Sequence, residues 1–337
     1  MTVSSRISWT GSSQDHMFTV DPQLNKGTKE AWAEVCSNSK KKSKPDPVVY
    51  GFSPIAARLS GVQSRPDYIN SSESADLFGM LERLVITPGH QVLSLDVFDT
   101  LVLRNNKSEA YRYLELSERI LERLRTEKVV ADDATLTATD LCLARIAGMQ
   151  VSYRIRKPVS GCVEGSIAEV IAVQIAILNL PEECDALFLE EEIGYEIDNL
   201  TPNQVLIDIA SKFTRAGGQV VLVSDMYLDG DSIEKIVNGV ICKRIWKKIY
   251  SSSDLIVSKR SGKIFKKVEK DLDVESTGFV HLGDSFTGDV MKPRQAGWSA
   301  IHFPVSEYEL VDRRANLDEF IVMMANKGFD VSGWAKI

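Results

Sequence analysis

Short apolar runs that end in an acid recur along the second part of the chain. The three clearest are HQVLSLDVF at residues 90–98, GGQVVLVSD at 217–225 and GFVHLGD at 278–284. Runs of this length are typical of strands buried on both faces of a parallel sheet. Residues 247–254 and 298–304 are weaker candidates for further strands. The pattern predicts an α/β fold built on a parallel sheet.

The long region between the first two predicted strands shows helical periodicity instead. Apolar residues recur there at a spacing of three and four, and Ser108 is placed to cap the first helix. The predicted helices cover residues 108–125, 138–149, 165–178 and 181–200, and the segment 201–218 leads back to the sheet. The sequence therefore predicts a helical insertion between strand one and strand two of the sheet.

The first 80 residues differ in composition from the rest. They are rich in Ser, Lys, Asn and Pro, and contain the basic stretch SKKKSK at 39–44, which we interpret as a solvated loop. A helix is predicted at 73–85. We expect an N-terminal extension with short elements, partly ordered by docking on the main body. The predicted organisation is an extension at 1–86, a core at 87–106 and 201–310, a helical domain at 107–200, and a C-terminal helix and tail at 311–337.

Composition narrows the class of protein. The 337 residues are 44% hydrophobic and 26% charged, which is ordinary for a globular chain. The net charge of −7 argues against a nucleic-acid partner. Five scattered cysteines without a CxxC pair argue against a zinc site or a disulfide framework, and favour reduced thiols in a cytoplasmic protein. No leader sequence and no apolar run of about 18 residues stand out, so no membrane span is expected.

The acids that end the predicted strands point to a site. The carboxyl ends of parallel strands meet at one edge, so Asp96, Asp225 and Asp284 should converge there. Nearby polar candidates are Asp99, Thr100, Ser224, Ser285, Asp289 and two lysines of a loop-to-helix segment, Lys259 and Lys263. Carboxylates with few cations repel one another, and a hard divalent cation with oxygen ligands, Mg²⁺, would relieve that repulsion. Such a site could bind a phosphoryl group, and an aspartate could attack it to form an acyl phosphate.

Four segments in order resemble the motifs of the haloacid dehalogenase (HAD) superfamily of Asp-dependent hydrolases. They are SLDVFDTL, VLVSD, KRSGKIF and HLGDSFTGDV, within a resemblance that covers roughly residues 88–305. The resemblance implies a HAD-like Rossmannoid parallel sheet between helices, with the helical insertion as a C1-type cap after the first core strand. It also implies a Mg²⁺-dependent phosphohydrolase that acts on a small phosphorylated metabolite, with sugar phosphates among the candidates.

The same resemblance assigns roles to the residues around the metal. It implies that Asp96 is the attacking nucleophile and also a Mg²⁺ ligand. The backbone carbonyl of Phe98 and the carboxylate of Asp284 would complete the protein ligands, with Asp289 as a supporting acid.

Other residues would bind the phosphoryl group. The resemblance implies this role for Ser224, Asp225 and Thr100. Aligned on the phenylalanine of KRSGKIF, the functional lysine is Lys259 and not Lys263. The stretch KSKPDPV at 42–48 matches the lysine motif better, but it precedes the nucleophile strand and is interpreted as a coincidence.

The first motif departs from the pattern of the family's phosphatases. These usually carry a second aspartate two residues after the nucleophile, which protonates the leaving oxygen and later activates water. Here that position is Phe98, and Asp99 follows it. Three alternatives remain open: Asp99 turns inward as the acid/base, Asp99 only caps the turn while another group or water moves the proton, or the protein is a weak or inactive hydrolase.

Two other functions stay in consideration. An aromatic residue two after the nucleophile is also found in the haloacid dehalogenases, so C–halogen hydrolysis is a formal alternative, although Asp284 and Asp289 would then be redundant. A HAD-like scaffold could also bind a phosphorylated ligand or, through its N-terminal extension, a protein partner. The motifs look most like predicted HAD hydrolases encoded with surface-polysaccharide biosynthesis enzymes. His281 is interpreted as a structural strand residue.

Overall fold

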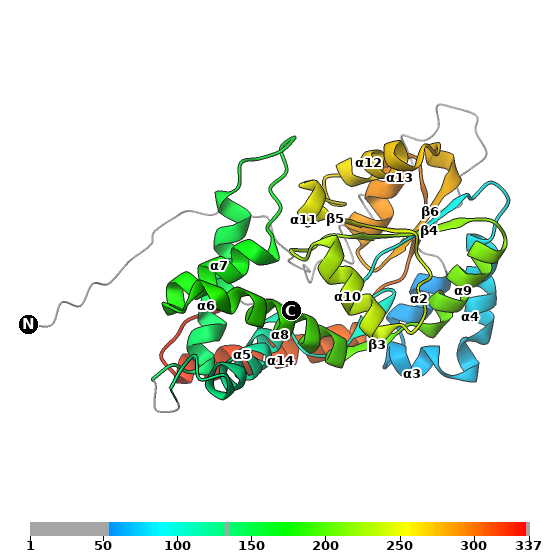
Figure 1. The fold of residues 1–337 in the computed structure, drawn as a ribbon. Coiled ribbons are helices and arrows are strands. Elements are labelled where there is room, and N and C mark those ends of the chain that lie inside the picture. The colour runs from blue at the N-terminus through cyan, green and yellow to red at the C-terminus, as the bar shows by residue number, and fades with distance from the viewer. Residues whose placement is uncertain (1–53, 132–134, 335–337) are drawn as a thin grey trace, which may run out of the picture. The chain divides into compact units, whose positions relative to one another are not determined.

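The computed structural model describes residues 54–131 and 135–334, which belong to one compact unit beginning at Val49 (Figure 1). The two lysine-rich stretches at 39–44 and 42–48 lie outside these residues. So do residues 1–53 of the predicted extension, and the proposed partner binding is not tested.

The centre of the described residues is a sheet of five parallel strands in the order β5–β4–β1–β6–β7. Their bounds are β1 Val92–Leu95, β4 Gln219–Ser224, β5 Lys248–Ser251, β6 Phe279–Gly283 and β7 Ser299–His302. All five apolar runs form strands, and the prediction of an α/β fold with a parallel sheet is confirmed.

Helices cover both faces of the sheet (Figure 1). On one face Val92 and Val221 pack with Phe265 and Trp298 in a common cluster. On the other face Leu93 belongs to the larger core cluster, because successive strand residues point to opposite sides. The helices of the first face are α12 Lys263–Leu272 and α13 Lys292–Ala296; those of the second are α4 Ala75–Val85, α9 Gln204–Arg215 and α10 Gly230–Val240. The short helix α11 Ser252–Leu255 follows β5.

The predicted helical insertion forms the cap. Its helices are α5 Glu109–Thr126, α6 Ala138–Ile155, α7 Ile167–Leu178 and α8 Asp185–Asn199, with the short helix η4 Glu182–Cys184 before the last. Ser108 caps α5 as expected, accepting a hydrogen bond from the Tyr111 amide at 3.2 Å. Two antiparallel strands, β2 Val102–Arg104 and β3 Leu200–Pro202, form the entry to and exit from the cap. The sequence pattern missed them because each has only three residues.

The described part of the N-terminal extension is helical and packs into the core. The predicted helix at 73–85 is α4, and two further helices precede it, α2 Pro54–Ser60 and α3 Arg65–Ile69, with the turn η3 Ser72–Ser74 between. Ile55, Leu59 and Leu81 are completely buried in the main cluster. From residue 54 onward this segment therefore contributes to the same hydrophobic core as the sheet.

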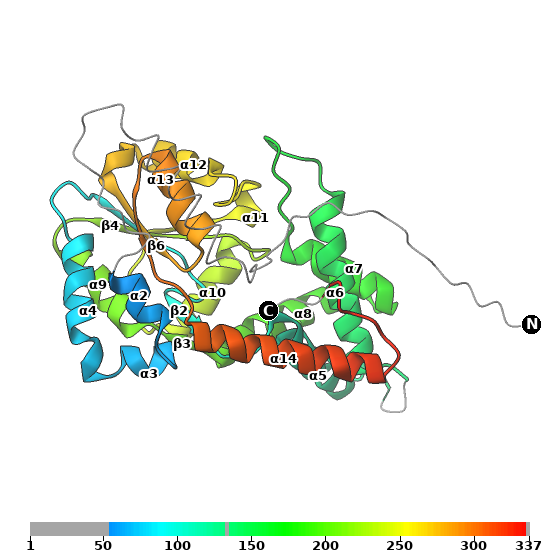
Figure 2. The same cartoon turned by 180° about the vertical axis from the view of Figure 1, so that it is seen from behind.

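The C-terminal helix, α14 Glu307–Asn326, begins four residues before the predicted start at 311. It lies alongside α5 (Figure 2). Its residues Phe320 and Met324 are buried with Ala110 and Leu114 of the cap. Asn316 Oδ1 also accepts hydrogen bonds from the amide and the hydroxyl of Ser108, at 2.8 and 3.0 Å. The helix thus helps to hold the first cap helix in place.

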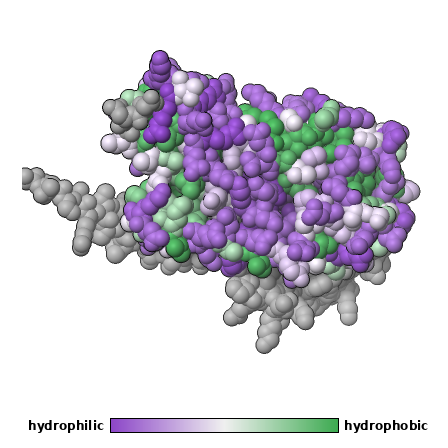
Figure 3. Space-filling model, turned by 90° about the horizontal axis from the view of Figure 1, so that it is seen from below, coloured by the Kyte–Doolittle hydropathy of each residue, from purple (hydrophilic) through white to green (hydrophobic). Residues whose placement is uncertain are grey.

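The outer surface is mixed, and the face in Figure 3 is mostly hydrophilic with smaller hydrophobic areas. Across the described ranges, no helix combines the length and apolarity that a bilayer crossing requires. The four cysteines described, Cys142, Cys162, Cys184 and Cys242, are unpaired, as predicted. Cys242 is exposed, whereas the other three are buried.

Candidate active site

Three neighbouring strands place acids at one edge of the sheet. β1 lies between β4 and β6, with Leu95 in register with Leu222 and Leu282. Because the strands run parallel, Asp96 and Asp284 leave adjacent strands at the same edge. The amide of Asp96 donates to the carbonyl of Leu282 at 2.8 Å, which fixes the chain as it leaves β1. The predicted convergence of strand-end acids is therefore present.

The carboxylates of Asp96, Asp284 and Asp289 form a compact cluster. One oxygen from each lies within 4.8 Å of the others. Asp289 reaches this place from the π-helix η6 Phe286–Met291, and its carboxylate accepts a hydrogen bond from the Ser285 amide at 2.9 Å. A Cβ atom at Gly283 would lie 2.2 Å from Asp289 Cγ, so only glycine leaves room for this close approach.

Lys259 supplies the positive charge that the structure places in the cluster. Its Nζ lies 2.5 Å from Asp96 Oδ1 and 2.6 Å from Asp289 Oδ1, and the side chain is almost fully buried. Asp225 holds the lysine's segment, since its carboxylate accepts hydrogen bonds from the amides of Lys259 and Arg260 at 2.7 and 3.2 Å. Lys263 instead donates to the carbonyl of Ser160 in the cap. The structure thus brings Lys259, and not Lys263, to Asp96.

Charge balance separates the three clustered acids. Burial, followed by the charges of Asp96 and Asp289, raises the pKa of Asp284 well above its usual value. Burial also raises the pKa of Asp96, against the opposing charge of Lys259. Burial acts the same way on Asp289, but the charge of Lys259 and a hydrogen bond from His281 outweigh it and lower the pKa of that acid. Asp284 is therefore the acid whose charge is least compensated.

The donor set fits Mg²⁺. The cluster offers carboxylate oxygens alone, which suit a hard cation. Within the described residues no side chain or amide forms a hydrogen bond or ion pair with the carboxylate of Asp284. The carbonyl of Phe98 is available too, because the amides of Leu101 and Val102 both donate to Val97 instead. A bound cation would relieve the repulsion that raises the pKa of Asp284.

His281 was expected to be structural, and it lies in β6 with no exposed surface. Its Nδ1 contacts the Ser94 hydroxyl at 2.7 Å and its Nε2 contacts Asp289 Oδ1 at 3.0 Å. The histidine is therefore part of the core and also orients Asp289. Alternation along the strand places residue 281 on the side opposite Val280 and Leu282, but nothing in the sequence shows its contact with Asp289.

The two predicted phosphoryl-binding hydroxyls lie near the end of β1 and at the end of the neighbouring strand β4. Thr100 Oγ1 donates to Asp96 Oδ2 at 3.3 Å, and its backbone carbonyl accepts a hydrogen bond from Asn203 at 2.9 Å. Ser224 ends β4, two residues beyond the partner of Leu95 in the register, Leu222, and is 3% exposed. Its hydroxyl has no hydrogen-bond partner among the described residues, which leaves it free to bind an oxygen of a ligand.

Asp99 is placed differently from the other predicted site residues. It has a positive φ of 59°, so the chain turns sharply after Phe98. Arg313 binds both of its carboxylate oxygens, at 2.7 and 3.1 Å, and Arg65 binds Oδ1 at 3.0 Å and the backbone carbonyl at 2.6 Å. Glu309 in turn holds Arg65 through its amide at 2.9 Å and its Nε at 2.5 Å. Sequence patterns could not reveal this clamp, since its members are up to 244 residues apart.

The arginines decide the ionisation of Asp99. Burial alone would raise its pKa, but the charge and hydrogen bonds of Arg313, with the charges of Arg65 and Arg104, lower the pKa far below its usual value. Arg104 Nη1 lies 3.9 Å from Asp99 Oδ2, and its guanidinium stands 4.3 Å from the centre of the Phe98 ring. Asp99 is thus held as a carboxylate.

The cap contacts the core close to the second motif. The carbonyl of Tyr227 accepts a hydrogen bond from the Ile167 amide at 2.7 Å, and its hydroxyl donates to Glu192 at 2.8 Å. Arg145 binds Glu192 at 2.7 Å and lies 4.8 Å from the centre of the Tyr227 ring. The chain that follows Ser224 is therefore anchored by buried groups of the cap.

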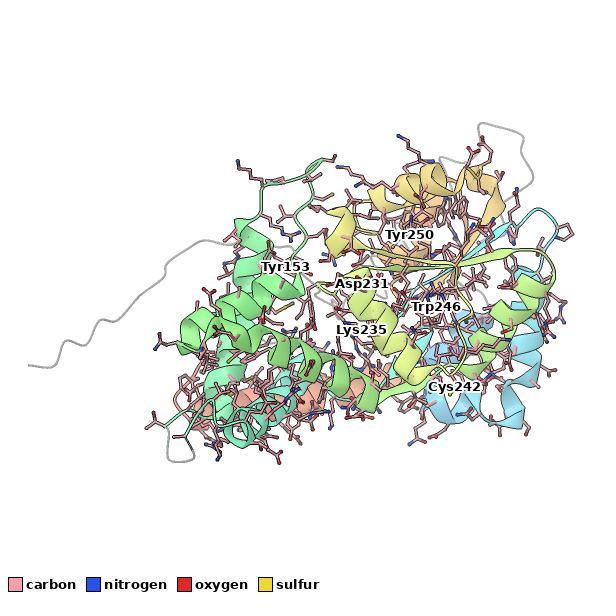
Figure 4. All side chains as sticks on the ribbon, in the orientation of Figure 1. Tyr153, Asp231, Lys235, Cys242, Trp246 and Tyr250 are labelled. Carbon is pink, nitrogen blue, oxygen red and sulfur yellow. The ribbon has the colours of Figure 1, made fainter. Side chains whose placement is uncertain are left out.

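A cap carboxyl, Glu164, also lies near the second motif. Burial and then the charge of Asp225 raise the pKa of Glu164 to about 7, while hydrogen bonds from Ser258 and Ser252 oppose this. Tyr153 of α6, labelled in Figure 4, has its pKa raised by burial and by the charge of Glu164. Glu164 was not predicted as a site residue, and its position in a loop carries no sequence signal.

Comparison with known proteins gave structural matches alone. No protein family matches the chain by its sequence profile, and no curated protein matches it in sequence. A dehalogenase structure aligns with 67% of this chain and 91% of its own, at 12% identity and a TM-score of 0.40. A HAD family enzyme from Bacteroides thetaiotaomicron, solved with magnesium and inorganic phosphate, aligns with 63% of this chain and 93% of its own, at 17% identity and 0.40. The L-2-haloacid dehalogenase of Xanthobacter autotrophicus aligns with 62% of this chain and 75% of its own, at 13% identity and a TM-score of 0.39.

These matched proteins are described as HAD-family enzymes and dehalogenases, and HAD is the superfamily that the four motifs resemble. At this level of identity the likeness concerns the fold. It does not distinguish phosphatases from dehalogenases, so the site itself has to carry the functional argument.

Proposed function

We propose that the protein is a Mg²⁺-dependent phosphohydrolase of the HAD type that acts on a small phosphorylated metabolite. The observation that carries the proposal is the cluster of Asp96, Asp284 and Asp289 around one buried lysine at the carboxyl edge of the sheet. A C–halogen hydrolase has no use for three clustered acids, which disfavours that alternative.

Each residue then has a defined part in the reaction. Asp96 attacks phosphorus and forms an aspartyl phosphate, and water later releases phosphate from it. Lys259 neutralises charge on the transferred group, while the hydroxyls of Ser224 and Thr100 orient its oxygens. Asp225 positions the lysine through its backbone contacts rather than touching the phosphoryl group.

The metal would be held by Asp96, Asp284 and the carbonyl of Phe98, with Asp289 in support. When bound, Mg²⁺ would neutralise part of the charge of a phosphoryl group and orient it for attack. Asp99 is proposed to fix the turn after the nucleophile and not to move protons, because three arginines surround its carboxylate.

The test is phosphate release from a panel of phosphorylated metabolites with Mg²⁺, comparing the wild type with Asp96→Asn. We expect the variant to lose activity by on the order of 10⁴-fold or more, as for loss of a covalent nucleophile elsewhere. Asn has the same size, so folding can be checked by an unchanged far-UV circular dichroism spectrum and a single cooperative unfolding transition. Equal turnover by both proteins would rule out the mechanism.

A second function keeps one observation in its favour. The clamp on Asp99 and the aromatic side chain of Phe98 leave no obvious proton donor, which suits a protein that binds a phosphorylated ligand without turnover. Tight binding of a phosphometabolite by the wild type, without release of phosphate from any compound of the panel, would favour this function.

A further inference from the structure

The side of the site next to Phe98 has an unusual composition. Its ring is 6% exposed and carries the Arg104 guanidinium at 4.3 Å. Arg104 makes only long ion pairs, 3.9 Å to Asp99 and 3.8 Å to Glu196, and its Nε is buried with no hydrogen-bond partner among the described residues. The position two residues after the proposed nucleophile is therefore occupied by an aromatic ring that contacts a guanidinium, and not by an acid.

Under the proposed function the other ionisable groups near Asp96 have other roles, and Asp284, which has no hydrogen-bond or ion-pair partner among the described residues, would hold the metal. Asp284 and Asp289 belong to the acid cluster, and Lys259 bridges Asp96 and Asp289. The carboxylate of Asp225 accepts two backbone hydrogen bonds. Both oxygens of Asp99 are bound by Arg313, which leaves neither of them free to carry a proton to a substrate.

Building on the proposed function, we infer that the substrate is an activated phosphoryl compound whose leaving group departs as an anion: an acyl phosphate, an enol phosphate or a phosphoanhydride. A general acid is worth about 10²–10⁴ in rate when the leaving group is a poor one, and little when the leaving oxygen is a weak base. Unactivated sugar phosphates would leave as alkoxides, which the site does not protonate. The expected substrates are therefore those phosphorylated metabolites that have a good leaving group.

The reaction balances without a donated proton. An oxygen of Asp96 bonds to phosphorus, and the bond from phosphorus to the leaving oxygen breaks with its electron pair on that oxygen. Water then bonds to phosphorus, the bond to Asp96 breaks with its pair returning to the carboxylate, and both protons of the water stay on the product phosphate.

The test compares leaving groups in the wild-type protein with Mg²⁺. The substrates are acetyl phosphate and p-nitrophenyl phosphate, with good leaving groups, then phenyl phosphate, and finally glycerol phosphate with an alkoxide. We expect kcat/KM to fall by about 10²–10⁴ along the series, the size of a missing general acid. Values that agree within tenfold for glycerol phosphate and acetyl phosphate would overturn the inference.

Two variants of Phe98 sharpen the result. Phe98→Asp should raise the ratio of glycerol phosphate to p-nitrophenyl phosphate hydrolysis by about tenfold or more, because it supplies a carboxyl that can protonate the alkoxide. Phe98→Asn is the matched control, of the same size but without an acid. Equal ratios in the two folded variants would contradict the inference. If both variants fail to fold, the wild-type series decides alone.

Glu164→Gln tests the rival acid. We expect the ratio of glycerol phosphate to p-nitrophenyl phosphate hydrolysis to be the same as in the wild type. A selective loss of glycerol phosphate hydrolysis would show that the cap supplies the proton and would overturn the inference. Failure of the proposed function looks different: no compound of the series would yield phosphate, or Asp96→Asn would be as active as the wild type. Fast hydrolysis of glycerol phosphate that depends on Asp96 would exclude the restriction to activated phosphoryl compounds, and would leave the proposed phosphohydrolase function in place.

Discussion

Two acids three residues apart, Asp96 and Asp99, stand in opposite electrostatic surroundings. Asp96 lies in a cluster with Asp284 and Asp289 and forms an ion pair with one lysine, Lys259. Asp99 is a single carboxylate that arginines from α3, β2 and α14 surround. The first group has too few cations and the second has too many for one acid.

The difference separates reactive from structural carboxylates. An acid cluster without enough cations is costly unless a metal ion binds, so its persistence indicates a function. A buried acid whose oxygens are all paired with arginines is a fixed part of the fold. Sequence spacing alone treats the two as similar candidates, whereas their partners assign them different roles.

The largest expected effect on stability comes from the arginine clamp. Asp99→Asn should lower the free energy of unfolding by about 3–5 kcal/mol, because it leaves buried arginines without their counter-charge. Asn tolerates the positive φ of this position, so the change isolates charge from backbone strain. Urea unfolding measures the loss. A change below about 1 kcal/mol would mean that the clamp is dispensable.

The opposite sign is expected in the acid cluster. Without divalent cations, Asp284→Asn should raise the free energy of unfolding by about 1–2 kcal/mol, since it removes a carboxylate that burial, and then the charges of Asp96 and Asp289, disfavour. With Mg²⁺ the wild type should gain thermal stability, and the variant should gain much less. The two melting temperatures, each with and without Mg²⁺, give the result. An equal gain in both proteins would place the metal elsewhere.

The fold was largely predictable from the sequence, whereas the clamp was not. Period and length identified the strands, because a strand buried on both faces needs a short continuous apolar run. The strand-end acids followed from the geometry of parallel sheets. Arg65 and Arg313 could not be predicted, because their pairing with Asp99 spans 34 and 214 residues. The same holds for Glu164, whose relevance depends on how a cap loop packs against the core.

The smallest expected effect concerns Glu164, a partly buried acid that lies outside the cluster of Asp96, Asp284 and Asp289. Its pKa in the folded protein, about 7, is above the ordinary value of 4.5. The folded state therefore binds the proton more tightly than the unfolded state, and this contribution to stability is lost as pH rises from about 4.5 to about 7. Asp225, with a pKa raised to about 6, acts the same way at lower pH.

Between pH 6 and 7 the pH dependence of stability therefore reports on Glu164 more than on Asp225. Glu164→Gln should make the free energy of unfolding less dependent on pH there, relative to the wild type, because the neutral amide no longer binds or releases a proton. Urea unfolding at several pH values measures the slope, and the difference between variant and wild type isolates the contribution of Glu164. Glu275→Gln, at an exposed position, is the matched control. If the free energy of unfolding depends on pH in the same way in the wild type and in Glu164→Gln, then burial does not raise the pKa of Glu164 in the folded protein.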